Sequence, residues 1–190
     1  MKSLKESIFD DVEDIASDDT VLIEQFLKDN YIIEGTYKID ASYTINDNVV
    51  DVKGHVIVKN EKIESLTNGL FRFGTVNGNF YCTGCPKLKT LEGAPKKVNE
   101  DFDCSRCKNL KSLEGGPEMV SRNFDCSDCP NLASLKGSPM KVGGDFDCGW
   151  CESLTSLKGG PGKVTGDFYC RNCKNLKITN QDRSKYSIES

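Results

Sequence analysis

Ten cysteines form five Cys-x-x-Cys pairs, and they are the residues of this 190-residue chain whose type and spacing most suggest chemistry. Eighteen residues separate Cys107 from Cys126, which satisfies the spacing of four-cysteine zinc sites. One such set would be Cys104, Cys107, Cys126 and Cys129. A structural zinc ion held by thiolates is therefore one interpretation of the repeated pairs.

Several features favour a different role for these cysteines. Five pairs cannot be divided into four-cysteine sites without a remainder, and the only histidine, His55, lies outside the array. Disulfides between stacked strands are geometrically feasible, but they need an oxidising compartment, and the N-terminus lacks the apolar segment of a secretory signal. A free cysteine packs well as a small apolar group. We therefore interpret the cysteines as packing residues and expect no cofactor.

Every pair belongs to a larger repeat of 22 residues, F-x-C-x-x-C-x-x-L-x-x-L-x-G-x-P-x-x-V. The units begin, without any insertion, at Phe80, Phe102, Phe124, Phe146 and Phe168. Val98, Glu100, Phe102 and Cys104 alternate with polar residues, which predicts one half-buried strand in each unit. Such a strand cannot bury its apolar face alone, whereas stacked coils can. The expected architecture is a mainly-β repeat solenoid with a parallel strand ladder and a turn-rich outer side.

The repeat resembles the cysteine form of the leucine-rich repeat. More narrowly, "SLEGGPEMVSRNFDCSDCPNLASLKGSP" resembles the leucine-rich-repeat-like proteins encoded by tailed bacteriophages. The resemblance departs from the family where three residues, and not two, stand between Val98 and Phe102. It implies a phage-encoded protein, either in the virion or in the host cytoplasm, that acts as a protein-binding or virion-associated module.

The sequence as a whole predicts three parts: an N-terminal cap at residues 1–48, a solenoid at 49–178 and a polar tail at 179–190. Apolar spacing predicts two helices and a divergent first coil, and "YKIDASYTIND" predicts a strand or a hairpin with a turn at residues 46–48. The helix positions are Leu4, Ile8, Phe9, Val12 and Ile15, then Leu22, Ile23, Phe26 and Leu27; the coil positions are Val56, Val58, Ile63 and Leu66. "TNGLFRFGTVNGN" is interpreted as a linker. The tail is too polar to cap the solenoid, so we expect it to fray.

Acidic residues dominate the outward positions of the predicted strands. One row contains Tyr81, Asp103, Asp125, Asp147 and Tyr169, and a neighbouring row contains Asp101, Asp145 and Asp167. Like charges on adjoining strands repel unless a counter-charge is near. The rows are therefore either a solvated face or a recognition surface for a protein with a basic surface, and calcium is a weaker third interpretation. Trp150, in a mostly polar row, is either an interface anchor or a residue packed over a neighbouring coil.

Other functions have little support. A single histidine and the absence of a phosphate-binding glycine loop argue against catalysis. The net charge is −4 without a dense basic stripe, so we expect no nucleic-acid partner. Apolar runs are too short for a membrane span. The sequence thus predicts a non-enzymatic protein-interaction module.

Overall fold

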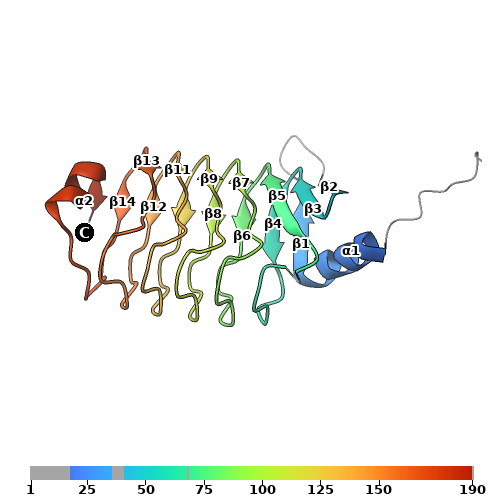
Figure 1. Ribbon diagram of the computed structural model, residues 1–190, viewed down its shortest axis with the longest axis horizontal. Coiled ribbons are helices and arrows are strands. Elements are labelled where there is room, and N and C mark those ends of the chain that lie inside the picture. The colour runs from blue at the N-terminus through green and yellow to red at the C-terminus, as the bar shows by residue number, and fades with distance from the viewer. Residues whose placement is uncertain (1–17, 36–40, 68, 190) are drawn as a thin grey trace, which may run out of the picture.

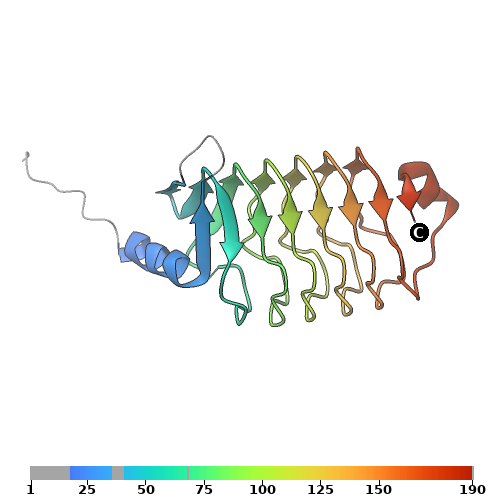
Figure 2. The same cartoon turned by 180° about the vertical axis from the view of Figure 1, so that it is seen from behind.

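The computed structural model describes residues 18–35, 41–67 and 69–189, which form an elongated rod of stacked coils (Figures 1 and 2). Most coils contribute one short strand to each of two sheets, and neighbouring coils pair in parallel. The chain is a β-solenoid of about six turns, so the predicted fold class is confirmed.

The eight-stranded sheet contains β1 (Tyr31–Glu34), β4 (His55–Val58), β6 (Phe80–Tyr81), β8 (Phe102–Asp103), β10 (Phe124–Asp125), β12 (Phe146–Asp147), β14 (Phe168–Tyr169) and β15 (Ile188–Glu189). The seven-stranded sheet contains β2 (Tyr43–Asn46), β3 (Val49–Val52), β5 (Arg72–Val76), β7 (Lys97–Val98), β9 (Met119–Val120), β11 (Lys141–Val142) and β13 (Lys163–Val164). Two helices, α1 (Asp18–Asn30) and α2 (Asn180–Lys185), lie at opposite ends of the rod (Figure 1).

The prediction of one strand per repeat is wrong, because each repeat turns a corner between two strands. Val98 ends β7, and Phe102 begins β8 in the other sheet. Side chains bridge the coils at this corner: the Asn79 Oδ1 accepts the Asp101 N–H at 2.8 Å, and the Asp101 Oδ1 accepts the Asn123 N–H at 2.9 Å. The three residues between Val98 and Phe102 form this corner.

The interior consists of columns of identical side chains, one from each coil. Ring centroids of Phe80, Phe102, Phe124, Phe146 and Phe168 are 5.4, 5.1, 5.2 and 4.9 Å apart along the column. Valine, leucine and cysteine columns lie beside it, and nearly all of their members are buried. Burying one such aromatic or aliphatic side chain contributes roughly 1.5–3 kcal/mol, so every coil adds a similar increment.

The N-terminal end is closed by α1 and two antiparallel strand pairs. Of the two predicted alternatives, a strand or a hairpin, β2 and β3 form the hairpin, and its turn residues Asp47 and Asn48 adopt φ of 49° and 57°. In α1, Ile23 and Leu27 are buried, whereas Leu22 is exposed. The predicted helix containing Leu4, Ile8, Phe9, Val12 and Ile15 lies outside the described residues.

The segment interpreted as a linker is part of the solenoid. It contains β5, which pairs in parallel with β3 and β7. Phe73 and Val76 of β5 are fully buried. The segment therefore supplies the seven-stranded sheet's strand for an early coil, a role that its glycines concealed in the sequence.

The C-terminal tail folds as a cap, which corrects the expectation that it frays. Thr179 and Asp182 form a reciprocal capping box at the start of α2. The Tyr186 ring stacks on Phe168 with centroids 4.5 Å apart, and its hydroxyl donates to the Pro161 carbonyl at 2.7 Å. Ile188 then pairs with Phe168 in the ladder. One aromatic and one aliphatic residue suffice to cover the last coil, despite the polar composition of the tail.

Candidate functional site

All ten cysteines are free thiols, arranged in two columns inside the rod. Nine are buried, and Cys173 in the last coil is half-buried. The second cysteine of a pair donates its thiol proton to the backbone carbonyl of the first cysteine in the preceding coil: Cys107 to Cys82 at 3.2 Å, Cys129 to Cys104 at 3.4 Å, Cys151 to Cys126 at 3.3 Å and Cys173 to Cys148 at 3.1 Å. The cysteines therefore fill space and also satisfy backbone carbonyls at the turn.

The surroundings of the first cysteines keep them protonated. Burial disfavours the thiolate and raises the pKa of Cys82, Cys104 and Cys126 well above its usual value. Within residues 18–35, 41–67 and 69–189, no three His, Cys, Asp or Glu side chains form a group that could hold a metal ion. Cys104 and its neighbours in the suggested zinc set are accordingly not brought together as ligands.

Outside, the aspartate row (Asp103, Asp125 and Asp147) runs along the eight-stranded sheet, as the sequence predicts. Strand register places the three residues opposite one another on neighbouring strands, and all are half-buried. Each carboxylate accepts a backbone N–H two residues further along the chain: Ser105 on Asp103 at 2.8 Å, Ser127 on Asp125 at 2.8 Å and Gly149 on Asp147 at 2.7 Å. These aspartates therefore hold the turn that follows each strand, a role that alternation alone did not reveal.

The neighbouring row, Asp101, Asp145 and Asp167, also forms hydrogen bonds that support the fold. Asp145 accepts the backbone N–H of Asp167 at 2.8 Å, and thereby continues the corner ladder. Asp167 in turn accepts the hydroxyl of Ser187 at 3.1 Å and that of Tyr169 at 3.4 Å. The outward acidic residues therefore also hold the turns and corners of the coils. In the aspartate row, Oδ1 of each carboxylate accepts the backbone N–H.

The electrostatics of this face reflect partial burial and like charge. Burial is the largest cause that raises the pKa of Asp103 and of Asp147, and the neighbouring Asp125 charge raises both further. At the ends of the row, burial followed by nearby carboxylates raises the pKa of Tyr81 and Tyr169. A cation close to this face would relieve the repulsion.

Trp150 projects from the turn that follows Asp147, with 59% of its surface exposed. It therefore does not pack over a neighbouring coil. Its φ is 59°, in the left-handed region, as are those of Gly84, Arg106, Asp128 and Asn172 at the equivalent positions. That conformation costs a residue with a side chain about 1–2 kcal/mol, and glycine, asparagine or aspartate tolerates it best. Tryptophan at this position is thus locally unfavourable for the fold.

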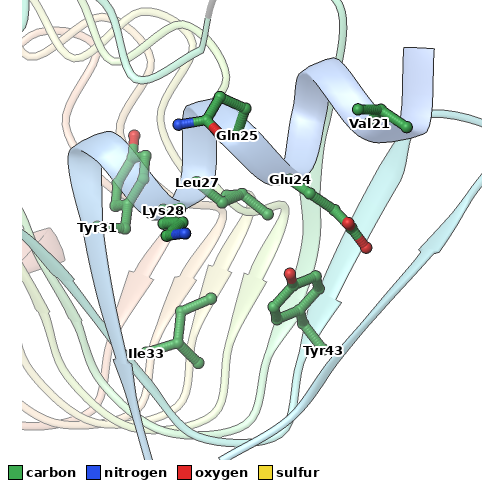
Figure 3. A pocket seen from close by; sticks show the side chains of 8 residues that line it. All are labelled: Val21, Glu24, Gln25, Leu27, Lys28, Tyr31, Ile33 and Tyr43. Carbon is green, nitrogen blue, oxygen red and sulfur yellow. The ribbon is translucent and has the colours of Figure 1, made fainter. Parts of the chain in front are cut away.

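A pocket that the sequence did not reveal lies at the N-terminal end. Its volume is about 460 Å³, and its lining combines α1 with the first two strands. Figure 3 shows Ile33 and Tyr43 facing Leu27 and Glu24 of the helix across this space. The lining is largely apolar, with Glu24 and Lys28 as its charged members. It can accept an apolar group, and the helix α1 that lines it lies at the opposite end of the rod from α2 (Figure 1).

No protein-family model, no curated protein and no solved structure matches this chain. Among the described residues, neither helix is long and apolar enough to cross a lipid bilayer. An inference about function therefore depends on the geometry of the outward face of the eight-stranded sheet.

Proposed function

We propose that this protein is a non-enzymatic interaction module that binds a basic protein segment along the outward face of the eight-stranded sheet. The observation that carries the proposal is Trp150, a large aromatic residue that is exposed on a turn whose backbone conformation disfavours it. Strain and exposure without a benefit to packing are typical of residues kept for binding. The adjacent aspartate row defines the charge of the partner.

Binding would combine two contributions. The carboxylates of the aspartate row attract lysine or arginine, and a cation over the Trp150 indole contributes about 0.5–1 kcal/mol at an exposed site. Partly buried carboxylates are screened by salt less than fully exposed ones, so they can steer a basic segment towards the tryptophan. Tyr81 and Tyr169 supply aromatic edges at the ends of the row.

The resemblance to tailed-phage repeat proteins supports a phage-encoded origin and association with the virion as part of this proposal. A zinc-binding function, the alternative that the paired cysteines suggest, has no support from the described residues, because their thiols donate to carbonyls along the columns.

The chain contains a single tryptophan, so its fluorescence reports binding at this face specifically. Titration with a short peptide in which Lys alternates with Ser should shift Trp150 emission, and a Glu–Ser peptide should not. Asp103→Asn, Asp125→Asn and Asp147→Asn together should weaken Lys-peptide binding by roughly tenfold at low salt, because three charges are lost while each Oδ1 acceptor remains.

A matched control removes three carboxylates elsewhere on the coils. Glu64, Glu114 and Glu152 pair with Lys89, Lys136 and Lys174 on exposed surface. Changing the three glutamates together to Gln should leave peptide binding almost unchanged. Equal losses in the two triple variants, or a Trp150 emission indifferent to the basic peptide, would overturn the proposed function.

A further inference from the structure

The seven-stranded sheet carries a lysine row (Lys97, Met119, Lys141 and Lys163) on its outward face. Strand register places these four residues opposite one another on β7, β9, β11 and β13, and all four are exposed. None of the three lysines forms an ion pair with another described residue. The row is therefore three uncompensated cations interrupted by one exposed apolar side chain.

The outward row of the eight-stranded sheet extends the aspartate row through Tyr169 to Glu189. Tyr169 lies opposite Asp147 in the ladder, and Glu189 of the C-terminal cap lies opposite Tyr169. Followed from the C-terminal end, the row is acidic, aromatic, acidic and acidic. The lysine row, followed from its N-terminal end, is basic, apolar, basic and basic.

The two patterns share one spacing, because both rows are parallel ladders with a strand separation of about 4.8 Å. Two rods laid antiparallel bring Lys163, Lys141, Met119 and Lys97 of one rod opposite Asp125, Asp147, Tyr169 and Glu189 of the other. Every lysine then faces a carboxylate, and Met119 faces an aromatic ring. In every parallel register, and in every other antiparallel register, at most two of the three lysines lie opposite an acidic residue.

We propose that the lysine row is a docking surface for the acidic row of a second copy of this chain, with the two rods antiparallel. The inference rests on the proposed function in one respect, since both use the acidic face. The contact pairs the lysine row of one rod with the acidic row of the other, so it is heterologous and leaves one row of each rod free to bind a further copy. The contact is small and mainly electrostatic, so its Kd should be on the order of 0.1 mM and should rise steeply with salt.

Sedimentation velocity over a range of protein concentrations tests this dimer. The unmodified chain should form dimers and, at higher concentration, larger assemblies at about 50 mM salt, and it should dissociate at about 500 mM. Lys141→Glu with Lys163→Glu should weaken dimerisation at least tenfold. The matched control, Lys108→Glu with Lys111→Glu, makes the same charge change at two exposed lysines away from the row and should leave dimerisation intact. Thermal unfolding of each variant verifies that it folds.

A complementary variant identifies the contact. Asp125→Lys with Asp147→Lys should also fail to self-associate, and its mixture with Lys141→Glu/Lys163→Glu should form a heterodimer. Asp125→Asn with Asp147→Asn, which keeps both turn acceptors, covers the case in which the lysine variant fails to fold. A chain that stays monomeric near 1 mM at low salt, or equal weakening by the control lysines, would refute the docking surface.

The outcomes separate this inference from the proposed function. Lys141→Glu/Lys163→Glu leaves the acidic face unchanged, so this monomeric variant should bind the basic peptide at least as well as the parent. Peptide binding by a chain that never dimerises refutes the dimer alone. If the chain dimerises but its Trp150 emission does not shift when the basic peptide is added, only the proposed function is refuted.

Discussion

The inside and the outside of each coil follow the same 22-residue period but obey different rules. Phe124 and Asp125 are neighbours on one strand, yet the Phe124 column contains phenylalanine in every repeat, whereas the Asp125 row changes to tyrosine at both ends. Buried columns allow little variation because identical shapes stack with few voids. The outward rows can vary, and the variation is where specificity for a partner can be encoded.

The outward rows still serve the fold, through one atom of each side chain. Oδ1 of Asp125 accepts the Ser127 N–H at 2.8 Å. Asparagine could hold the same backbone group, as Asn123 does at the corner. At Asp103, Asp125 and Asp147 the turn therefore uses a side-chain acceptor that asparagine could also supply, so it does not require a negative charge.

The largest difference between inside and outside should appear on removing one ring. Phe124→Ala should lower the free energy of unfolding by about 3–5 kcal/mol, because the column leaves no neighbour free to fill the space. Phe124 stacks on rings 5.1 and 5.2 Å away on its two sides. Met140→Ala removes an outward side chain that is 68% exposed. It should change the free energy of unfolding by less than about 0.5 kcal/mol. Chemical denaturation measures both, and similar losses would abolish the contrast.

A smaller effect should distinguish the cysteine column from ordinary apolar packing. Cys129 donates its thiol to the Cys104 carbonyl at 3.4 Å, and a serine hydroxyl could make the same hydrogen bond. Cys129→Ala, which leaves that carbonyl unsatisfied, should cost about 1–2 kcal/mol, and Cys129→Ser should cost less. Urea denaturation of the two variants decides the order. If Ser costs more than Ala, the column is held by apolar contact alone.

The repeat made the interior predictable from the sequence. Period and residue type together identified the inward Phe and Cys positions, because a two-residue alternation fixes which side chains share a face. Phe102 and Cys104 are both buried, as expected. The fold class follows from the stacking of such units, which no single coil could achieve.

The misses share a physical cause, since alternation of residue types does not reveal where a backbone turns. From Val98 to Phe102 the alternation continues through a corner, and the Asp101 carboxylate that bridges coils there looks like an ordinary outward residue in the sequence. Tyr186 was hidden by polar neighbours, although its one ring covers Phe168. The left-handed turn at Trp150 was equally invisible, because its row contains residues as different as Gly84 and Arg106.

The smallest expected effect concerns the charge that the fold does not need. Asp103→Asn with Asp147→Asn keeps both Oδ1 acceptors and removes two carboxylates whose pKa is raised chiefly by burial. A carboxyl group whose pKa is higher in the folded state stabilises the fold fully only below its unfolded pKa, about 3.9 for aspartate. That contribution is lost as the pH rises through the folded pKa. The parent should therefore lose stability relative to the double variant from about pH 4 towards neutrality.

At neutral pH the variant should equal or slightly exceed the parent, by less than about 1 kcal/mol, because solvent screens half-buried charges. Denaturant titrations at several pH values measure the difference, and Glu114→Gln serves as the opposite control. Lys136 beside Glu114 lowers the pKa of that carboxyl. The parent should therefore become more stable than the Glu114→Gln variant as the pH rises. If the free energy of unfolding of the parent instead rises relative to that of the double variant with increasing pH, the aspartate charges stabilise the turn. The hypothesis that the fold needs only the Oδ1 acceptor, and that the charge serves a partner, would then be wrong.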